Sequence, residues 1–72
     1  MRTVSYKITE EVSDKYFNYT VRIFDEYSEK CIAIWGVQSL ADAIMDIAQD
    51  VSVRDYDLAG VKFEDKNGNI YR

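Results

Sequence analysis

The chain opens with two stretches in which apolar and polar side chains alternate, residues 3 to 12 and residues 16 to 26. Alternation with a period of two predicts strands that each bury one face. A two-residue turn at Ser13-Asp14 would join them as a hairpin. In that register the inward side chains meet in three pairs: Ile8 with Tyr19, Tyr6 with Val21, and Val4 with Ile23.

Residues 30 to 37 predict a third strand, which is apolar on both faces. A turn with Ser28-Glu29 at its tip places Ile34 opposite Ile23 and completes an antiparallel meander. A strand of this kind is normally covered on both sides. One face of the strand carries Ile32 and Ile34, and the other carries Cys31, Ala33, Trp35 and Val37.

A helix is predicted from the Ser39 N-cap, with Asp42 in its first turn, to about residue 53. Its apolar positions recur at helical spacing and predict the side that packs on the sheet. This stripe consists of Leu40, Ile44, Ile47, Ala48 and Val51. The far side is expected to carry Asp42, Asp46, Gln49 and Asp50.

The C-terminal segment contains Asn67-Gly68, a strong signal for a β-hairpin. That turn places Val61, Phe63 and Ile70 on one face. The whole chain, residues 1–72, therefore predicts a single α+β domain of order β-β-β-α-β-β. It comprises a small antiparallel sheet in the form of a three-stranded meander, one amphipathic helix and a C-terminal β-hairpin. Two placements of the hairpin remain open, within the main sheet or beside the helix.

One helix covers only one face of the meander, so the other face is expected to show an apolar patch with Phe24, Trp35 and Arg22. Exposed apolar patches mark interaction sites, and Trp and Arg are enriched at binding hot spots. The C-terminal hairpin is an alternative cover for this patch. A homodimer contact and an aromatic platform for single-stranded RNA are two further alternatives.

Asp42, Asp46 and Asp50 follow one another at four-residue spacing on the predicted helix. Carboxylates at this spacing repel weakly, by about 0.2 to 0.5 kcal/mol per pair. A solvated helix face explains them without a function. They also suit a negative surface that meets a basic partner or imitates a phosphate backbone. A hard cation is a third possibility, although no second acidic segment supports a metal site.

The composition removes several kinds of chemistry. The net charge is −4 and the chain has no histidine, so we expect no direct nucleic-acid binding, no anionic membrane and no His-based catalysis. Cys31, the only cysteine, is expected to be a small buried hydrophobe. No segment suggests a signal peptide or membrane span, which predicts a cytoplasmic location. We expect neither an enzyme nor a bound cofactor or metal.

Residues 19–50, YTVRIFDEYSEKCIAIWGVQSLADAIMDIAQD, resemble the strand–strand–helix part of HicB-type antitoxin domains, where a meander leads into a Ser-capped helix. The Pro-Gly-Cys-like turn of that family is missing, so no functional residue is carried over.

The sequence predicts a non-enzymatic, small acidic protein-binding module. An inhibitor or adaptor that docks on a basic surface of a nucleic-acid-handling enzyme fits this description, by analogy with phage anti-restriction and anti-CRISPR proteins. The alternative is a structural or regulatory homodimer that uses the exposed sheet face. The predicted partner-binding residues are Asp42, Asp46, Asp50, Phe24, Trp35 and Arg22.

Overall fold

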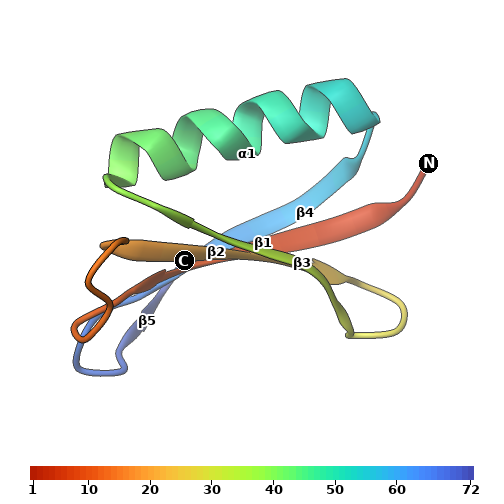
Figure 1. Ribbon diagram of the computed structural model, residues 1–72. Coiled ribbons are helices and arrows are strands. Elements are labelled where there is room, and N and C mark those ends of the chain that lie inside the picture. The colour runs from red at the N-terminus through yellow and green to blue at the C-terminus, as the bar shows by residue number, and fades with distance from the viewer.

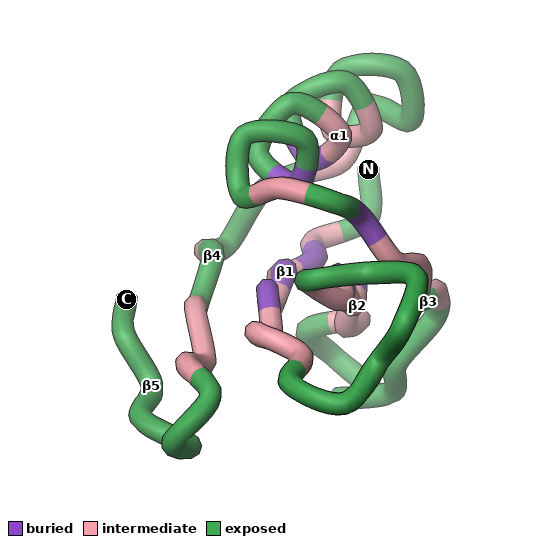
Figure 2. The backbone as a smooth tube through the Cα atoms, turned by 60° about the vertical axis from the view of Figure 1, so that its left-hand side comes forward, coloured by how far each residue is buried: buried purple, intermediate pink, exposed green.

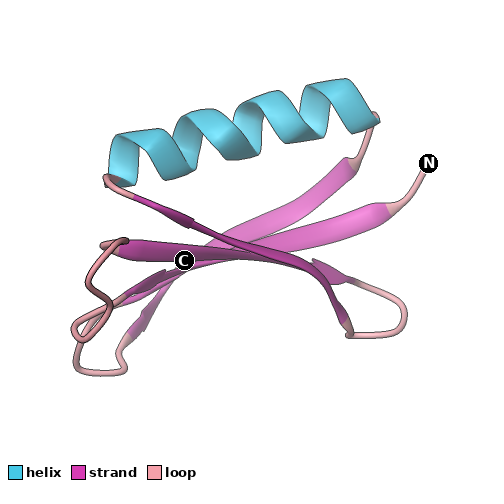
Figure 3. Cartoon of the chain, in the orientation of Figure 1, coloured by secondary structure: helices cyan, strands magenta, loops and turns pink.

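Six elements follow one another in the computed structural model, which describes all 72 residues (Figure 1). They are β1 (Thr3–Glu10), β2 (Tyr19–Asp25), β3 (Cys31–Val37), α1 (Leu40–Arg54), β4 (Asp57–Glu64) and β5 (Ile70–Tyr71). The strands form one five-stranded sheet in the order β3-β2-β1-β4-β5, and α1 lies over one face of it (Figure 3). The predicted α+β class and element order are confirmed.

The loop that joins β1 to β2 is longer than predicted. Residues 11–18 form a loop in place of the two-residue turn at Ser13-Asp14, so Tyr6 lies opposite Ile23 rather than Val21. The Asp14 carboxylate accepts two backbone N–H groups of this loop, at 2.7 and 3.0 Å, and thereby holds a separate turn inside it. The register moves by two residues, which keeps every side chain on its predicted face.

β3 pairs with β2 one residue away from the predicted register. Ala33, not Ile34, lies opposite Ile23, and Ile32 is the extra residue of a β-bulge. The two-residue turn at Ser28-Glu29 is wrong, because the carboxylate that ends β2 accepts two loop N–H groups and shapes a longer loop. A slip of one residue exchanges the faces of a strand. The side chains of β3 that face the helix are therefore Ala33, Trp35 and Val37.

The C-terminal hairpin joins the main sheet, and β4 runs parallel to β1. The sheet is therefore mixed, and the prediction of an antiparallel sheet is wrong at this pair of strands. Parallel neighbours need a crossover connection, and α1 supplies it by carrying the chain across the sheet from β3 to β4 (Figure 1). Val61 of β4 lies beside Tyr6, and Lys62 lies beside Lys7.

The turn between β4 and β5 is one residue longer than the predicted two-residue turn at Asn67-Gly68. Gly68 has a φ of 85°, and the N–H of Asp65 donates to the carbonyl of Asn69 at 2.9 Å. Phe63 consequently lies opposite Tyr71, so Tyr71 rather than Ile70 shares its face.

The N-cap of α1 is formed as the sequence predicts, whereas its C-cap was not predicted. The side-chain oxygen of Ser39 accepts the backbone N–H of Asp42 at 3.1 Å, which satisfies one free donor of the first turn. At the other end Asp55 adopts a left-handed conformation with a φ of 54° and stops the helix.

The side of α1 that packs on the sheet is rotated from the predicted stripe. Its buried residues are Ala43 and Ile47, whereas Leu40 and Ile44 remain 39% and 56% exposed. The reason is the position of the helix, which packs on β2 and β3 and leaves much of β4 and β5 uncovered. Figure 2 shows buried residues in purple where α1 meets the sheet and exposed residues in green along β5.

The core lies between α1 and the three strands of the meander. It is wholly apolar apart from one tyrosine hydroxyl, and no charged residue is buried. Its members are Val4, Tyr6, Ile8, Val21, Ile23, Val37, Ala43 and Ile47.

Two further findings concern single features of the chain. Cys31 is exposed at the start of β3, so its predicted burial is wrong. The one helix is too short and too polar to cross a lipid bilayer.

Candidate functional site

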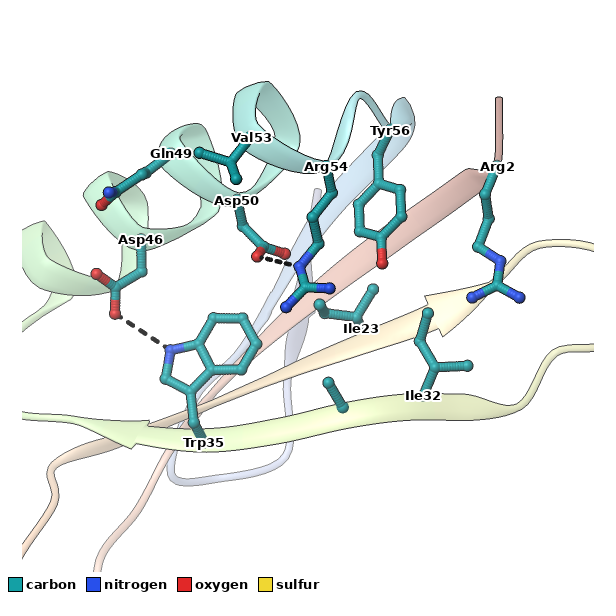
Figure 4. A pocket seen from close by; sticks show the side chains of 11 residues that line it. Arg2, Ile23, Ile32, Trp35, Asp46, Gln49, Asp50, Val53, Arg54 and Tyr56 are labelled. Atoms are coloured by element: carbon teal, nitrogen blue, oxygen red, sulfur yellow. Dashed lines mark hydrogen bonds and ion pairs between the residues drawn. The ribbon is translucent and has the colours of Figure 1, made fainter.

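A cleft of about 840 Å³ lies between α1 and β3 (Figure 4). Its volume is within the range of roughly 300 to 1,000 Å³ that is usual for ligand-binding pockets. The wall formed by β3 carries no charged side chain, whereas α1 contributes Val53 together with charged side chains. The lining residues are Arg2, Ile23, Ile32, Ala33, Trp35, Asp46, Gln49, Asp50, Val53, Arg54 and Tyr56.

Trp35 and Asp46 face each other across this cleft. The indole N–H of Trp35 donates to Asp46 (Nε1 to Oδ2, 3.2 Å), and Figure 4 shows the ring rising from β3 towards the carboxylate on α1. Trp35 reaches the cleft because the β-bulge turns it to the helix side. Asp46 reaches it because it lies directly before Ile47, at the margin of the buried side of α1.

Asp50, one helical turn further on, is held by two groups of the protein. The buried hydroxyl of Tyr6 donates to its Oδ2 at 2.8 Å, and Arg54 Nε lies 2.9 Å from its Oδ1. Burial, followed by the hydrogen bond to Asp50, raises the pKa of Tyr6 above its ordinary value. The same carboxylate raises the pKa of Arg54 through its hydrogen bond and its charge. Asp50 is thus a structural anchor between helix and sheet.

The charges that line the cleft sum to zero, but they are not paired with one another throughout. Arg54 pairs with Asp50, and Arg2 pairs with Asp25 at 3.2 Å from Nε to Oδ2. Asp46 is the charged lining residue that has no cationic partner. Its only side-chain hydrogen bond comes from the indole, so it retains capacity to accept more.

A carboxylate beside an indole is suited to binding a guanidinium or ammonium group. The carboxylate accepts charge-assisted hydrogen bonds, and the ring attracts the cation through its π face. Val53 and Ile32 provide apolar surface in the same cleft for the stem of a long cationic side chain.

The structure places the predicted site residues in three separate locations. Trp35, Asp46 and Asp50 meet in the cleft, so the expectation that Asp46 and Asp50 lie on the far side of the helix is wrong. The reason is the rotated helix, whose margin towards β3 carries these two residues. Asp42 stays exposed in the first turn of α1.

Phe24 and Arg22 lie on the face of the sheet away from α1, here called the outer face. They alternate with the inward residues of β2, so they are separated from Trp35, which was predicted to share their face. Arg22 donates from Nη1 to the hydroxyl of Thr9 at 3.1 Å and stands beside Lys7 on the neighbouring strand. The outer face therefore lacks the predicted Trp35 and carries Phe24 and Ile34 beside the expected Arg22, while Lys7 pairs there with Glu64 at 2.7 Å.

Tyr6, which does not line the cleft but holds Asp50, was not predicted as a hydrogen-bonding group, and neither Arg2 nor Tyr56 was predicted among the lining residues. A usable signal existed for Tyr6, because a tyrosine in an inward series with Val4 and Ile8 needs a partner for its hydroxyl. No such signal exists for Arg2 and Tyr56, which the parallel pairing of β1 and β4 brings to the end of the cleft.

Comparison with protein-family models gives no match for this chain, and no significant match is found among curated proteins or among solved structures. These comparisons lend no support to the resemblance to HicB-type domains, so the site is interpreted from its own geometry.

Proposed function

We propose that this chain is a non-enzymatic protein-binding module that holds a basic side chain of another protein in the cleft between α1 and β3. The observation that carries the proposal is the unpaired carboxylate of Asp46, which the Trp35 indole orients at 3.2 Å. The proposal differs from the sequence interpretation in its geometry, since one oriented carboxylate replaces a row of three.

The charge of the whole chain supports the same kind of partner. A net charge of −4 attracts a basic surface and repels an acidic one during diffusional encounter. Trp35 and Tyr56 add aromatic surface to the cleft, and such side chains are enriched in protein interfaces.

An inhibitor or adaptor of a nucleic-acid-handling enzyme is the more specific form of this proposal, because such enzymes carry basic surfaces. The alternative, in which a row of carboxylates imitates a phosphate backbone, is less well supported. It needs several free carboxylates, and Asp50 is already engaged by Tyr6 and Arg54. Insertion of one arginine or lysine of the enzyme beside Asp46 fits the cleft better.

The proposal is tested with a short oligo-arginine peptide and the fluorescence of Trp35, the only tryptophan of the chain. We expect the peptide to change this fluorescence and Asp46→Asn to weaken binding about tenfold or more. The physical reason is that a hydrogen bond to a charged group contributes about 1.5 to 3 kcal/mol.

Asp42→Asn is the matched control, because it removes the same charge from an exposed position of the same helix. It should change the affinity by no more than about twofold, as is usual for an exposed charge. Equal losses for the two variants, or a fluorescence that does not respond to the peptide, would contradict the proposed function.

Self-association through the outer face is the second candidate function. The observation in its favour is Ile34, which lies on that face and is 59% exposed. Sedimentation distinguishes the two candidates, because a wild-type chain that remains monomeric at high concentration excludes the homodimer.

A further inference from the structure

The open edge of the sheet runs directly beside the cleft. β3 is the terminal strand of the sheet, and its residues also form one wall of the cleft. The edge and the cleft therefore offer two kinds of recognition side by side, backbone hydrogen bonds and a charged aromatic site.

The register identifies the backbone groups that point to the open edge. In an antiparallel pair the hydrogen-bonding direction alternates from residue to residue. The carbonyl of Val37 accepts the N–H of Asn18 at 3.0 Å, so Val37 is directed towards β2, and Trp35 follows the same alternation. The intervening residues, Ile34 and Gly36, direct their N–H and C=O groups away from the sheet.

Nothing in the side chains of this edge blocks the addition of another strand. β3 has the sequence CIAIWGV, without a charged residue or a proline. Natural edge strands usually carry lysine, proline or covering elements that prevent such pairing. A β-bulge lies at Ile32, but Ile34 and Gly36 follow it in a regular ladder.

We infer that the basic partner binds as an added strand on the open edge of β3, through an extended apolar–basic–apolar segment whose basic residue lies opposite Trp35. This inference rests on the proposed function and adds the conformation and the side-chain order of the partner segment. Strand addition to an exposed edge is a recurring mode of peptide recognition, in which the backbone provides affinity and alternate side chains provide specificity.

The side-chain order follows from the pleat of the sheet. Residues directly opposite one another share a face, with Cβ atoms roughly 4.5 to 5.5 Å apart in an antiparallel pair. A partner residue opposite Trp35 therefore points to the helix side, next to the indole and towards Asp46. An arginine or lysine there reaches the unpaired carboxylate and contacts the aromatic ring.

The two flanking residues of the partner point to the outer face. One lies beside Ile34, which is exposed and apolar. The other lies beside Gly36, over which the Phe17 ring is packed so closely that a Cβ on Gly36 would be 2.3 Å from it. Apolar residues at these two positions gain contact with Ile34 and Phe17.

Charge complementarity selects a basic segment of another protein over a second copy of this chain. A second β3 strand contains no cation, so it would leave Asp46 unpaired. It would also bring two acidic protomers together, each with a net charge of −4. A basic segment of another protein supplies a strand and a positive charge together, which a second β3 strand does not.

The first experiment compares two short peptides of identical composition. In one peptide valine and arginine alternate, and in the other the arginines are grouped at one end. Both carry the same charge, but only the alternating peptide presents arginine to one face of a strand. We expect the alternating peptide to bind at least about tenfold more tightly, measured by Trp35 fluorescence and by calorimetry.

The second experiment removes one backbone donor at the edge. Cys31 permits chemical ligation of residues 1–30 to residues 31–72, and the second fragment is synthesised with an N-methyl group on Ile34. The N–H of Ile34 is not used within the sheet, so thermal melting should match that of the unmethylated ligated chain. Binding of the alternating peptide should weaken at least about tenfold.

Amide hydrogen exchange provides a measurement that needs no altered chain. Binding of the alternating peptide should slow exchange at Ile34 and Gly36 in the wild-type protein. Unchanged exchange at both amides in the bound state would overturn the inference, whatever the behaviour of the methylated chain.

The outcomes separate this inference from the function on which it rests. If Asp46→Asn abolishes binding but neither the peptide order nor the methyl group matters, the cleft function stands and strand addition is wrong. If the edge matters and Asp46→Asn has no effect, the proposed function is wrong. A wild-type dimer that the methyl group on Ile34 dissociates would assign the edge to a second copy and overturn the inference.

Discussion

The tyrosine hydroxyl of Tyr6 is the one polar group placed among the core residues, and its role depends on a single contact. Tyr6 is 1% exposed, and its hydroxyl donates to Asp50 at 2.8 Å. This bond joins the central strand of the sheet to α1 and orients the carboxylate that also pairs with Arg54. One hydrogen bond therefore supports both the packing of the helix and the shape of the cleft.

We expect Tyr6→Phe to lower the free energy of unfolding at neutral pH by about 1 to 3 kcal/mol, since the lost bond involves a charged acceptor. The folded-state pKa of Tyr6 is raised, so its contribution is fully present below the ordinary tyrosine pKa of about 10. It is lost as the pH rises through the raised folded-state value. Stability should consequently fall more steeply above about pH 10 in the wild type than in Tyr6→Phe.

Urea unfolding at neutral and alkaline pH measures this difference. Tyr27→Phe is the control, because Tyr27 is 87% exposed and its hydroxyl makes no hydrogen bond in the structure. A parallel decline of wild type and Tyr6→Phe at alkaline pH would show that the bond to Asp50 does not perturb Tyr6.

At the scale of the elements, the limits of α1 follow from local chemistry, but its rotation does not. Ser39 caps the first turn as the sequence predicts, because capping involves groups only three residues apart. The face that packs depends on where the helix crosses the sheet. α1 contacts β2 and β3, which brings Ala43 and Ile47 inward and leaves Ile44 at the side.

Two isoleucine truncations test this rotation. Ile47 is 5% exposed and Ile44 is 56% exposed, although the sequence assigned both to one stripe. We expect Ile47→Ala to lower the free energy of unfolding by about 2 to 4 kcal/mol through lost burial and a residual cavity. Ile44→Ala should cost less than about 1 kcal/mol. Similar losses in urea unfolding would contradict the observed packing.

At the scale of the whole molecule, a chain of net charge −4 carries a cleft in which the Asp46 carboxylate has no cationic partner. The net charge of −4 acts over distances of roughly a Debye length, about 10 Å at 0.1 M salt. The proposed contact between a basic side chain and Asp46 would act at hydrogen-bond distance and be screened much less. The two effects therefore belong to different steps of binding.

We expect salt to separate these steps in stopped-flow measurements of Trp35 fluorescence with the oligo-arginine peptide. Raising the salt concentration should mainly slow association, because long-range attraction is screened. Asp46→Asn should mainly speed dissociation, whereas Asp42→Asn should slightly slow association. If salt changed only the dissociation rate, long-range attraction by the acidic surface would have no part in binding.

The sequence alone was sufficient for the element types and their order, for the inward residues of β1 and β2, and for the cap of α1. Each of these depends on neighbours along the chain: alternation sets the faces of a strand, and a serine side chain reaches the next turn of a helix. Trp35 and Asp46 were both predicted as partner-binding residues, but on opposite sides of the molecule, whereas the structure places them in contact.

Only the tertiary structure decided the register of β3, the parallel pairing of β4 with β1 and the rotation of α1. The loop after Asp25 is longer than a two-residue turn, and the β-bulge residue Ile32 then shifts the pairing of β3 by one residue, which carries Trp35 from the predicted outer face to the helix side. The cleft exists because that slip and the off-centre helix coincide. Both result from packing between segments distant in the chain, a free energy that no local pattern of residues reports.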